Sequence, residues 1–338
     1  MQSVDENPSG GVFVYDPLDH PIDWLAERCS RVTLGAPLYA SGRSRQKIPP
    51  AELIDKAQGH DVLLGASGAA VTRGVMEAIP TLRMVCKLGI GYEVVDVDAA
   101  TELGIVVTNT PVHGEIGPVA EHAVALMLSA LKRLSFYTPE YLQSGGWKDP
   151  EKMSGLIEGA VVGIIGFGQI GQAVARRLGG WNCKIVVSDP ALDKAPEGIE
   201  LMSLDDLLVL ADVVTVHMPG LKPGQATLID RERLKLLKPS AVIVNTARGN
   251  LIDETALAEA LHGNRLGGAS LDVYSPEPPL PGSAILTAPN VTLTPHMAAW
   301  NPKVRLEMVE MAFEDIADFL SGRIPSHIIN PSVLEGRR

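Results

Sequence analysis

The chain has 338 residues, too many for one ordinary hydrophobic core, and this length predicts two domains of roughly 150 residues each. Its formal net charge of −11, with no run of Lys and Arg, argues against a nucleic-acid partner. The three cysteines, Cys29, Cys86 and Cys183, are scattered and form no CxxC pair, so we expect neither a disulfide framework nor a metal site.

The sequence carries no sign of membrane attachment or export. No apolar run approaches the roughly 18 to 20 residues that a membrane-spanning helix needs. The first residues, MQSVDENPSGG, are polar and acidic and lack the basic start and apolar core of a signal peptide. We therefore expect a cytoplasmic protein without a membrane partner.

Short apolar runs alternate with helical patterns over the first third of the chain. This alternation is typical of a parallel sheet with helices on its faces. Strands are expected at 12–15, 61–65, 82–88 and 104–108, and helices at 71–78 and 96–103.

The pattern changes near Pro111, and a long apolar helix is expected over 119–131. From Ala160 the alternation resumes. The run 160–165 contains no polar residue, as expected for a strand buried on both faces. The fold class is therefore α/β with doubly wound parallel sheets. Further strands are expected at 184–187, 213–216, 241–244, 268–271 and 291–293, and a final helix at 302–320.

A GxGxxG motif directly follows the strand 160–165 and opens a helical stretch. The motif alone is weak evidence, because simple tight turns also contain it, but this context is the one that dinucleotide binding requires. The first glycine allows a tight turn, the second lets the backbone approach a pyrophosphate, and the third lets helix and strand pack closely. The start of the helix offers free N–H groups to the phosphates. We expect cofactor contacts from Gly166, Gly168, Gln169, Ile170 and Gly171.

Asp189 closes the next strand, 23 residues after Gly166 and near the usual spacing of about 20. It is expected to accept the adenosine ribose hydroxyls, and its charge would repel a 2′-phosphate. The residues that follow, Pro190 to Leu192, include no Arg that could bind one. The sequence therefore favours NAD over NADP, although Asp189 could also be an ordinary turn residue before Pro190.

Three polar segments follow or end predicted strands in the second half: 245–253, 267–278 and 294–299. Ligands in doubly wound folds gather at the carboxyl ends of strands. The segments carry an ARG turn, a D-V-x-x-x-E-P stretch and a T-P-H turn, a specific combination downstream of GxGxxG. With these motifs the chain resembles the D-isomer-specific 2-hydroxyacid dehydrogenase family from about Asp61 to the final helix. The family includes phosphoglycerate and glyoxylate/hydroxypyruvate enzymes.

The resemblance implies roles for individual residues. Arg248 would bind the substrate carboxylate and carbonyl oxygen, and His296 would be the acid in reduction and the base in oxidation. Glu277 would hydrogen-bond His296, and Asp272 would lie near the nicotinamide. Arg248, Asp272 and His296 would also line the cofactor site. The remaining residues expected there are His217, Pro219, Thr246, Ala247 and Ala298.

These residue types suit the reduction of a ketone. Negative charge develops on the oxygen, and a His side chain can hold a proton within reach of it near neutral pH. A neighbouring carboxylate stabilises the imidazolium, and Arg offers a charged fork that matches a carboxylate. Each of these residues also has an ordinary structural interpretation, as a packed His, a turn-capping Arg or a loop acid. His217 is the rival for the role of acid.

The loop Leu88, Gly89, Ile90 and Gly91 follows a predicted strand, where family members hold the substrate carboxylate with backbone N–H groups. An ordinary strand-to-helix turn would have the same pattern. Phosphoglycerate enzymes place an Arg after the strand 61–65, and this chain has Ala66 there. We therefore expect a 2-keto or D-2-hydroxy acid without a phosphate.

The resemblance also implies an architecture of two Rossmann-like domains, one flavodoxin-like and one NAD-binding, with a cleft between them. Residues 1–111 and 301–338 would form the substrate-binding domain, and residues 112–300 the NAD-binding domain. Because the chain ends soon after the last helix, we expect no regulatory domain. A homodimer packed through the helix that begins at 120–122 is expected. Trp147 and Trp300 would either pack or reach the substrate.

Two other functions remain open at this point. Formate dehydrogenases of the family use Gln where this chain has Glu277, which favours an alcohol/ketone couple, but a phosphite-oxidising relative keeps the Glu. A non-enzymatic, NAD-sensing corepressor on the same fold can keep the Arg, Glu and His set. The preferred hypothesis is an NAD-dependent oxidoreductase.

Overall fold

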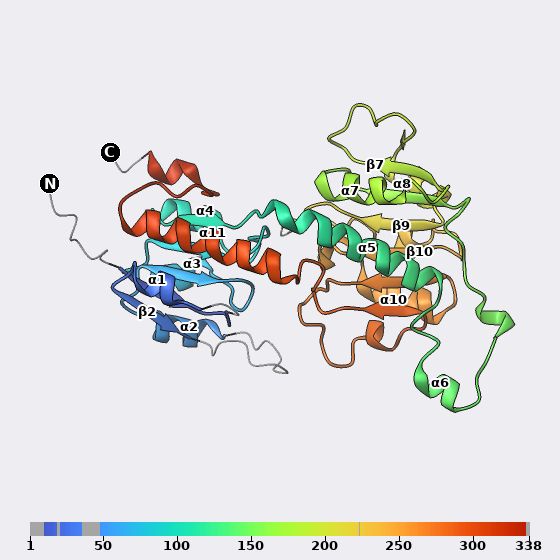
Figure 1. The fold of residues 1–338 in the computed structure, drawn as a ribbon, viewed down its shortest axis with the longest axis horizontal. Helices are drawn as coiled ribbons and strands as arrows, with labels where there is room; N and C mark the ends of the chain where they lie inside the picture. Colours follow the sequence, from blue (N-terminus) through green and yellow to red (C-terminus); the bar gives the residue numbers. More distant parts are fainter. Residues whose placement is uncertain (1–9, 19–20, 36–47, 223, 336–338) are drawn as a thin grey trace. The chain divides into compact units, whose positions relative to one another are not determined.

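The computed structural model describes residues 10–18, 21–35, 48–222 and 224–335, which fold into two compact units (Figure 1). The first unit contains the described residues up to Gly114 and those from Pro302 onward, and the second unit spans Glu115–Asn301. Most of the polar N-terminal stretch lies outside the described residues. No described helix is long and apolar enough to cross a membrane.

The first unit is built on a five-stranded parallel sheet in the order β2-β1-β3-β4-β5, the flavodoxin-like order. Four of its strands confirm the predicted alternation. The fifth, β2, was not predicted, because it is a half-exposed edge strand of four residues with no apolar run. The strands are β1 (Gly11–Val14), β2 (Arg31–Leu34), β3 (Val62–Gly65), β4 (Met84–Lys87) and β5 (Val106–Asn109).

Helices cover both faces of this sheet. Val12 and Val14 of β1 face a core shared with α1 and the long α11, whereas Phe13 packs on the opposite side against α2 and α3. Burial of both faces explains why β1 and β3 carry no polar side chain. The helices are α1 (Asp23–Ala26), α2 (Pro50–Ala57), α3 (Arg73–Glu77), α4 (Val97–Glu102) and α11 (Pro302–Leu320), with the short turns η1 (His113–Glu115) and η5 (Pro331–Leu334).

The second unit is built on a seven-stranded parallel sheet in the order β12-β11-β10-β9-β6-β7-β8. This is the dinucleotide-binding order with one added strand, and its direction of winding reverses between β6 and β9. Both predicted doubly wound sheets are thereby confirmed. The strands are β6 (Val161–Ile165), β7 (Lys184–Ser188), β8 (Glu200–Leu201), β9 (Val213–Val216), β10 (Val242–Asn245), β11 (Gly268–Leu271) and β12 (Val291–Leu293).

The helices of the second unit again form two layers. On one face α5 and α7 pack together over a core that includes Val162, Ile164 and Val244, and on the other face α8, α9 and α10 pack over Val214 and Ile243. They are α5 (Ile116–Leu131), α6 (Pro139–Gln143), α7 (Gln169–Leu178), α8 (Leu204–Leu210), α9 (Arg231–Leu234) and α10 (Glu254–His262), with η2 (Pro150–Lys152), η3 (Gly249–Leu251) and η4 (Ala284–Thr287).

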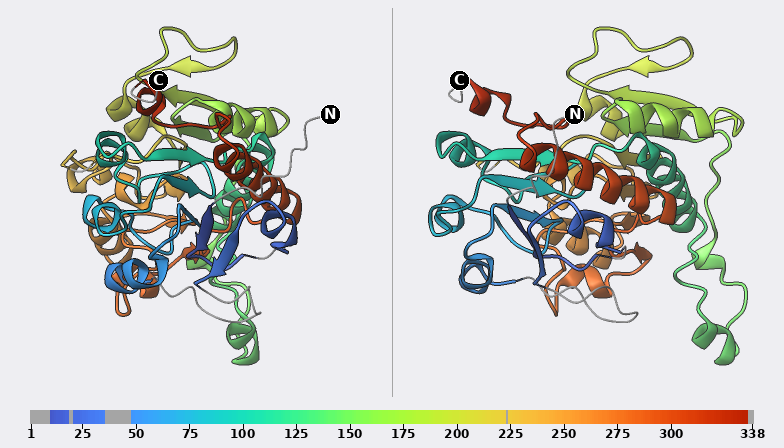
Figure 2. Two further views of the ribbon diagram at one scale, coloured as in Figure 1. Left: turned by 90° about the vertical axis from the view of Figure 1, so that its left-hand side faces the viewer. Right: turned by 60° about the vertical axis from the view of Figure 1, so that its left-hand side comes forward.

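One segment of the second unit leaves its layers. Residues 132–156, which carry α6 and η2, extend away from the seven-stranded sheet in all three views (Figures 1 and 2), and the chain returns to the core at Ile157. We call this segment the arm. It exposes several large apolar side chains, among them Trp147 with 70% and Met153 with 76% of its surface accessible.

Candidate active site

Three neighbouring strands bring the predicted catalytic residues to one edge of the second unit. Arg248 lies three residues after β10, Glu277 lies six after β11, and His296 lies three after β12. Because β10, β11 and β12 are adjacent and parallel, their carboxyl ends meet at the same edge. The fold thus gathers residues that are up to 48 positions apart in the sequence.

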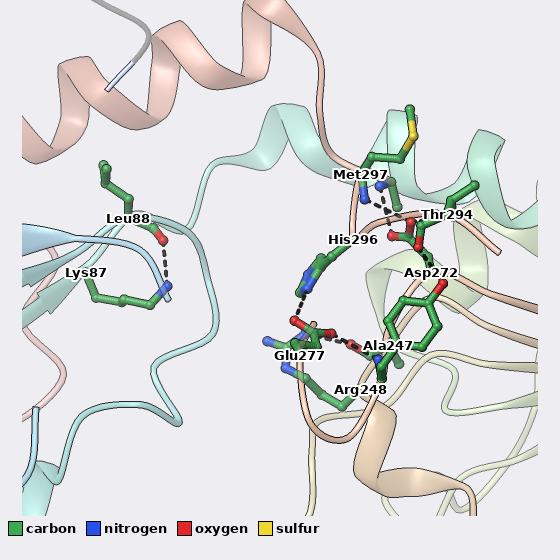
Figure 3. A network of polar contacts seen from close by, with 11 residues as sticks. Lys87, Leu88, Ala247, Arg248, Asp272, Glu277, Thr294, His296 and Met297 are labelled. Atoms are coloured by element: carbon green, nitrogen blue, oxygen red, sulfur yellow. Dashed lines mark hydrogen bonds and ion pairs between the residues drawn. The ribbon is translucent and has the colours of Figure 1, made fainter. Parts of the chain in front are cut away.

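His296 and Glu277 form a hydrogen-bonded pair. The imidazole Nδ1 lies 2.7 Å from the Glu277 Oε2 (Figure 3). Tyr274 N–H donates to Oε1 of Glu277 at 3.1 Å. Burial opposes the charged form of Glu277, but the hydrogen bond and charge of His296 outweigh it and hold the pKa of this carboxyl below its usual value. A charged carboxylate only accepts, so Nδ1 carries the hydrogen. Nε2 of the exposed ring then faces away from Glu277 as the nitrogen free to exchange a proton.

Arg248 stands beside this pair. Its guanidinium lies next to Glu277 in Figure 3, and its charge also lowers the pKa of the Glu277 carboxyl. Nη1 donates to the carbonyl oxygen of Ala247 at 2.7 Å, and Asn245 Nδ2 donates to the Arg248 carbonyl at 2.8 Å. These bonds fix the turn after β10. The second unit therefore holds a cation, a carboxylate and a histidine in one cluster.

Asp272 lies beneath the turn that carries His296. Its side chain is fully buried and accepts from Thr294 Oγ1 at 2.6 Å and Met297 N–H at 2.8 Å (Figure 3). It also accepts from Ala298 N–H at 2.9 Å. Its carbonyl oxygen accepts from His296 N–H at 2.8 Å. His296 itself has φ of +52°, a left-handed conformation that costs a non-glycine residue on the order of 1 kcal/mol. Asp272 is thus a support of the site.

This cluster follows a sequence pattern shared with known proteins. The sequence model of one protein family matches residues 124–298, just over half of the chain. That family is described as "D-isomer specific 2-hydroxyacid dehydrogenase, NAD binding domain". The chain belongs to this family. The resemblance inferred from the motifs is confirmed, and the second unit is the NAD-binding domain of a D-2-hydroxyacid dehydrogenase fold.

The similarity to individual known proteins also covers the first unit. The chain is 36% identical to a D-3-phosphoglycerate dehydrogenase of Methanocaldococcus jannaschii over 94% of its length, covering 59% of that protein. It is 35% identical to a glyoxylate reductase of Korarchaeum cryptofilum, covering 87% of this chain and 90% of that one. The crystal structure of a Thermus thermophilus protein superposes with a TM-score of 0.83 at 33% identity over 94% of this chain and 99% of that one. The chain spans about half the length of the phosphoglycerate dehydrogenases that it matches.

The glycine loop of this D-2-hydroxyacid dehydrogenase fold fits a dinucleotide. Gly166 has φ of +84°, and a Cβ there would collide with the His217 carbonyl, while a Cβ on Gly171 would collide with the carbonyl of Gly166. Space is open around Gly168, which caps the ten-residue α7 without any side-chain bond to its first N–H groups. These N–H groups, beginning at Gln169 and Ile170, can receive a pyrophosphate.

Asp189 lies at the end of β7 beside the same loop. Its Oδ2 accepts from Phe167 N–H at 2.7 Å, and its Oδ1 accepts from Ala191 N–H at 2.8 Å. Each carboxylate oxygen can accept more than one hydrogen, so both can also receive ribose hydroxyls. Asp189 therefore supports the glycine loop in addition to the ribose contact that the sequence suggested.

His217 follows β9 at the point where the sheet reverses. Burial lowers the pKa of its imidazole to about 3, and its Nε2 contacts Thr215 Oγ1 at 2.8 Å. The ring is therefore neutral near pH 7 and is not an imidazolium that could donate a proton to a substrate. Pro219 lies exposed two residues further, and Ala247 and Ala298 are buried in the turns that support Arg248 and His296. Among the described residues, the buried Thr246 Oγ1 has no hydrogen-bond partner, as suits a group that awaits a ligand.

The glycine loop of the first unit is partly occupied by its own contacts. Gly89 N–H donates to Thr110 Oγ1 at 2.7 Å, and Leu88 N–H donates to the Gly65 carbonyl at 2.8 Å. Within the described part of the chain, the N–H groups of Ile90 and Gly91 have no such partner. The buried Lys87, which the motifs did not indicate, donates to the Leu88 carbonyl at 2.6 Å (Figure 3).

Sequence reasoning also missed the residues that hold the catalytic turns. Tyr274 donates its hydroxyl to the Thr294 carbonyl at 2.8 Å, and burial raises the pKa of that hydroxyl. Thr294 links Asp272 to His122 on α5. The sequence shows a Tyr inside the D-V-x-x-x-E-P stretch and a Thr before Pro-His, but these residue types alone do not predict the hydrogen bonds.

Proposed function

We propose that the protein is an NAD-dependent dehydrogenase that interconverts a small 2-keto acid and its D-2-hydroxy acid. The observation that carries the proposal is the His296–Glu277 pair at 2.7 Å with the Arg248 guanidinium beside it. The second unit would bind NAD and the first unit the substrate. In keeping with the sequence, we place the protein in the cytoplasm, which fractionation of the source cells would test.

Bound NADH would supply the hydride that reduces the carbonyl carbon. Arg248 would bind the substrate carboxylate and carbonyl oxygen through its fork of N–H donors. His296 would donate the proton on Nε2 to the carbonyl oxygen as negative charge develops there, and would become neutral. Glu277 keeps Nδ1–H in place throughout and favours the imidazolium before transfer. In oxidation, neutral His296 accepts the hydroxyl proton.

The loop after β4 in the first unit offers backbone donors that suit a carboxylate. We assign the N–H groups of Ile90 and Gly91 to the substrate carboxylate, because those of Leu88 and Gly89 are already engaged. The loop after β3 is less suited to a phosphate. The N–H groups of Ala66 and Gly68 donate to the buried Asp16 carboxylate at 2.6 and 2.8 Å, and the residue directly after the strand is Ala66 rather than Arg. The substrate would therefore carry no phosphate.

A panel of acids tests this proposal. Glyoxylate, pyruvate, hydroxypyruvate and 3-phosphohydroxypyruvate would be offered with NADH, and formate and phosphite with NAD. We expect turnover of at least one non-phosphorylated 2-keto acid, with kcat/KM above that of the phosphorylated one. Preference for the phosphorylated acid would contradict the substrate class. Oxidation of formate or phosphite alone would assign the protein to that reaction instead of 2-keto acid reduction. NADH binding without any turnover would favour the NAD-sensing alternative.

Asp189 is expected to set the choice of cofactor. Replacing Asp189 by Asn should lower the ratio of NADH to NADPH affinity by about tenfold, because the charge that repels a 2′-phosphate is lost. The single amide oxygen of Asn can keep only one of the two bonds from the N–H groups of Phe167 and Ala191. Binding titration by cofactor fluorescence measures the ratio without turnover. Asp193, an exposed acid four residues further, provides the control Asp193→Asn. A wild-type protein that prefers NADPH would contradict the assignment.

The arm is the surface that we assign to a homodimer. Leu142, Trp147, Met153 and Leu156 are each more than half exposed there, an apolar area that a second copy would cover. Helix α5, also expected at the interface, buries Met127 in the core of its own unit and leaves Ala125 exposed. Replacing Trp147 by Glu should raise the dimer dissociation constant by about tenfold or more, as measured by analytical ultracentrifugation. The matched change Trp181→Glu, outside the arm, should leave it unchanged, and a monomeric wild type would refute the assignment.

A further inference from the structure

His122 lies on the inner side of α5, far in sequence from the catalytic turns but in contact with their support. Its Nε2 lies 3.0 Å from Thr294 Oγ1 and 3.5 Å from Asp272 Oδ1. Other polar links between α5 and the sheet, Ser129 with Thr292 and Ser270 with the Leu126 carbonyl, lie further along the helix. The His122 link is the one at the carboxyl ends of the strands, where the site lies.

The hydrogens in this chain of contacts can be placed. Thr294 has one hydroxyl hydrogen, and the 2.6 Å contact with the Asp272 carboxylate requires it, because a carboxylate only accepts. The Thr294 oxygen must then accept from His122, so Nε2 of His122 carries a hydrogen. This donor occupies a lone pair of Thr294 and keeps its O–H directed at Asp272.

The Asp272 carboxylate needs these donors. It is fully buried, and a buried carboxylate is costly unless it is paired with hydrogen-bond donors. Burial alone would raise the pKa of Asp272, but His122, Thr294 and the two backbone N–H groups of Met297 and Ala298 hold it below its usual value. The charged carboxylate in turn binds the backbone on the C-terminal side of His296.

We propose that His122 is a positioning residue of the active site, which acts through Thr294 and Asp272 to hold His296 in its strained turn facing Glu277. The chain of contacts runs from α5 through Thr294 to the Asp272 carboxylate, and from there to the N–H groups directly after His296. Helix α5 is thereby part of the catalytic arrangement as well as of the core. The inference rests on the proposed role of His296.

Three variants test the proposal. His122→Phe keeps a ring but removes the donor, His122→Gln keeps an N–H donor at a similar reach, and His262→Phe alters a matched histidine on α10 whose Nε2 contacts the Ala284 carbonyl. The first readout is the downfield proton signal of the His296–Glu277 hydrogen bond in the free protein, assigned by its loss in His296→Ala. The second is kcat with the best 2-keto acid, together with the Kd for NADH and thermal unfolding.

We expect His122→Phe to weaken or broaden that signal and to lower kcat by about threefold to tenfold, with the Kd for NADH within about twofold of wild type. His122→Gln should restore both, and His262→Phe should change neither. An unaltered signal in His122→Phe would overturn the proposal, as would equal loss in Phe and Gln variants. The proton signal can be measured without substrate. A wild type without turnover would therefore refute the proposed function, and the proton signal would still decide whether His122 positions His296.

Discussion

Replacing His296 by Ala is expected to lower kcat for 2-keto acid reduction by about 10²-fold or more, while the Kd for NADH changes by less than about threefold. Glu277 is held in its charged form and has no proton to give, and a guanidinium does not give one up, which leaves the imidazole as the proton donor of the cluster. Its removal leaves the developing alkoxide without a proton donor. Steady-state NADH oxidation and fluorescence titration of NADH measure the two quantities.

A second variant separates proton transfer from orientation. Glu277→Gln keeps an oxygen that can accept from Nδ1 but loses the charge that favours the imidazolium, so we expect a smaller fall in kcat, about tenfold. If His296→Ala retained wild-type kcat, the acid would have to be another group. His217 could not replace it, because burial lowers the pKa of its imidazole to about 3.

The predictable part of the fold is the part with two buried faces. The run 160–165 predicted β6 within one residue, and the final helix was predicted with its observed bounds, Pro302–Leu320. Such segments are continuous apolar runs or long amphipathic repeats, and these patterns fit few structures other than a buried strand or a long helix. Helix α7 begins at Gln169, so its first turn overlaps the glycine motif that the sequence placed before the helix.

The elements that escaped prediction lack this signal. Strand β8 has two residues, β2 is half exposed, and α6 buries no residue at all. Their formation depends on neighbours: β2 pairs along the whole of β1, and α6 is capped by the Thr138 side chain within the arm. Local composition cannot report contacts of this kind.

The candidate site was predictable where chemistry restricts the residue type. Arg248, Glu277 and His296 have few substitutes for carboxylate binding and proton transfer, and their motifs marked them. The supporting residues were not predictable, because many polar pairs could hold a turn. The contribution of Thr294, Tyr274 and His122 is to hold the turns by hydrogen bonds. These bonds, of 2.6 to 3.0 Å between donor and acceptor, form only when β11, β12 and α5 are packed together. The occupied N–H groups of Leu88 and Gly89 were hidden for the same reason.

Arg248 should account for most of the affinity for the acid. Replacing Arg248 by Gln is expected to lower kcat/KM by about 10²-fold to 10³-fold, with the Kd for NADH within about threefold of wild type. A charged, bidentate bond to the substrate carboxylate is lost, and the carbonyl oxygen loses a donor as it gains charge. Initial rates over a range of acid concentrations give kcat and KM separately.

The conservative variant and a matched control decide what the guanidinium does. Arg248→Lys keeps the charge but not the fork, so a carboxylate bound by one donor should leave KM well above wild type and kcat less affected. Arg265→Gln removes an exposed arginine of the same unit and should change neither constant. If Arg248→Lys restored kcat/KM fully, charge alone would suffice and a bidentate contact would be refuted. If Arg248→Gln raised the Kd for NADH as strongly as KM, Arg248 would belong to the cofactor site, and the acid would have to be bound by other donors.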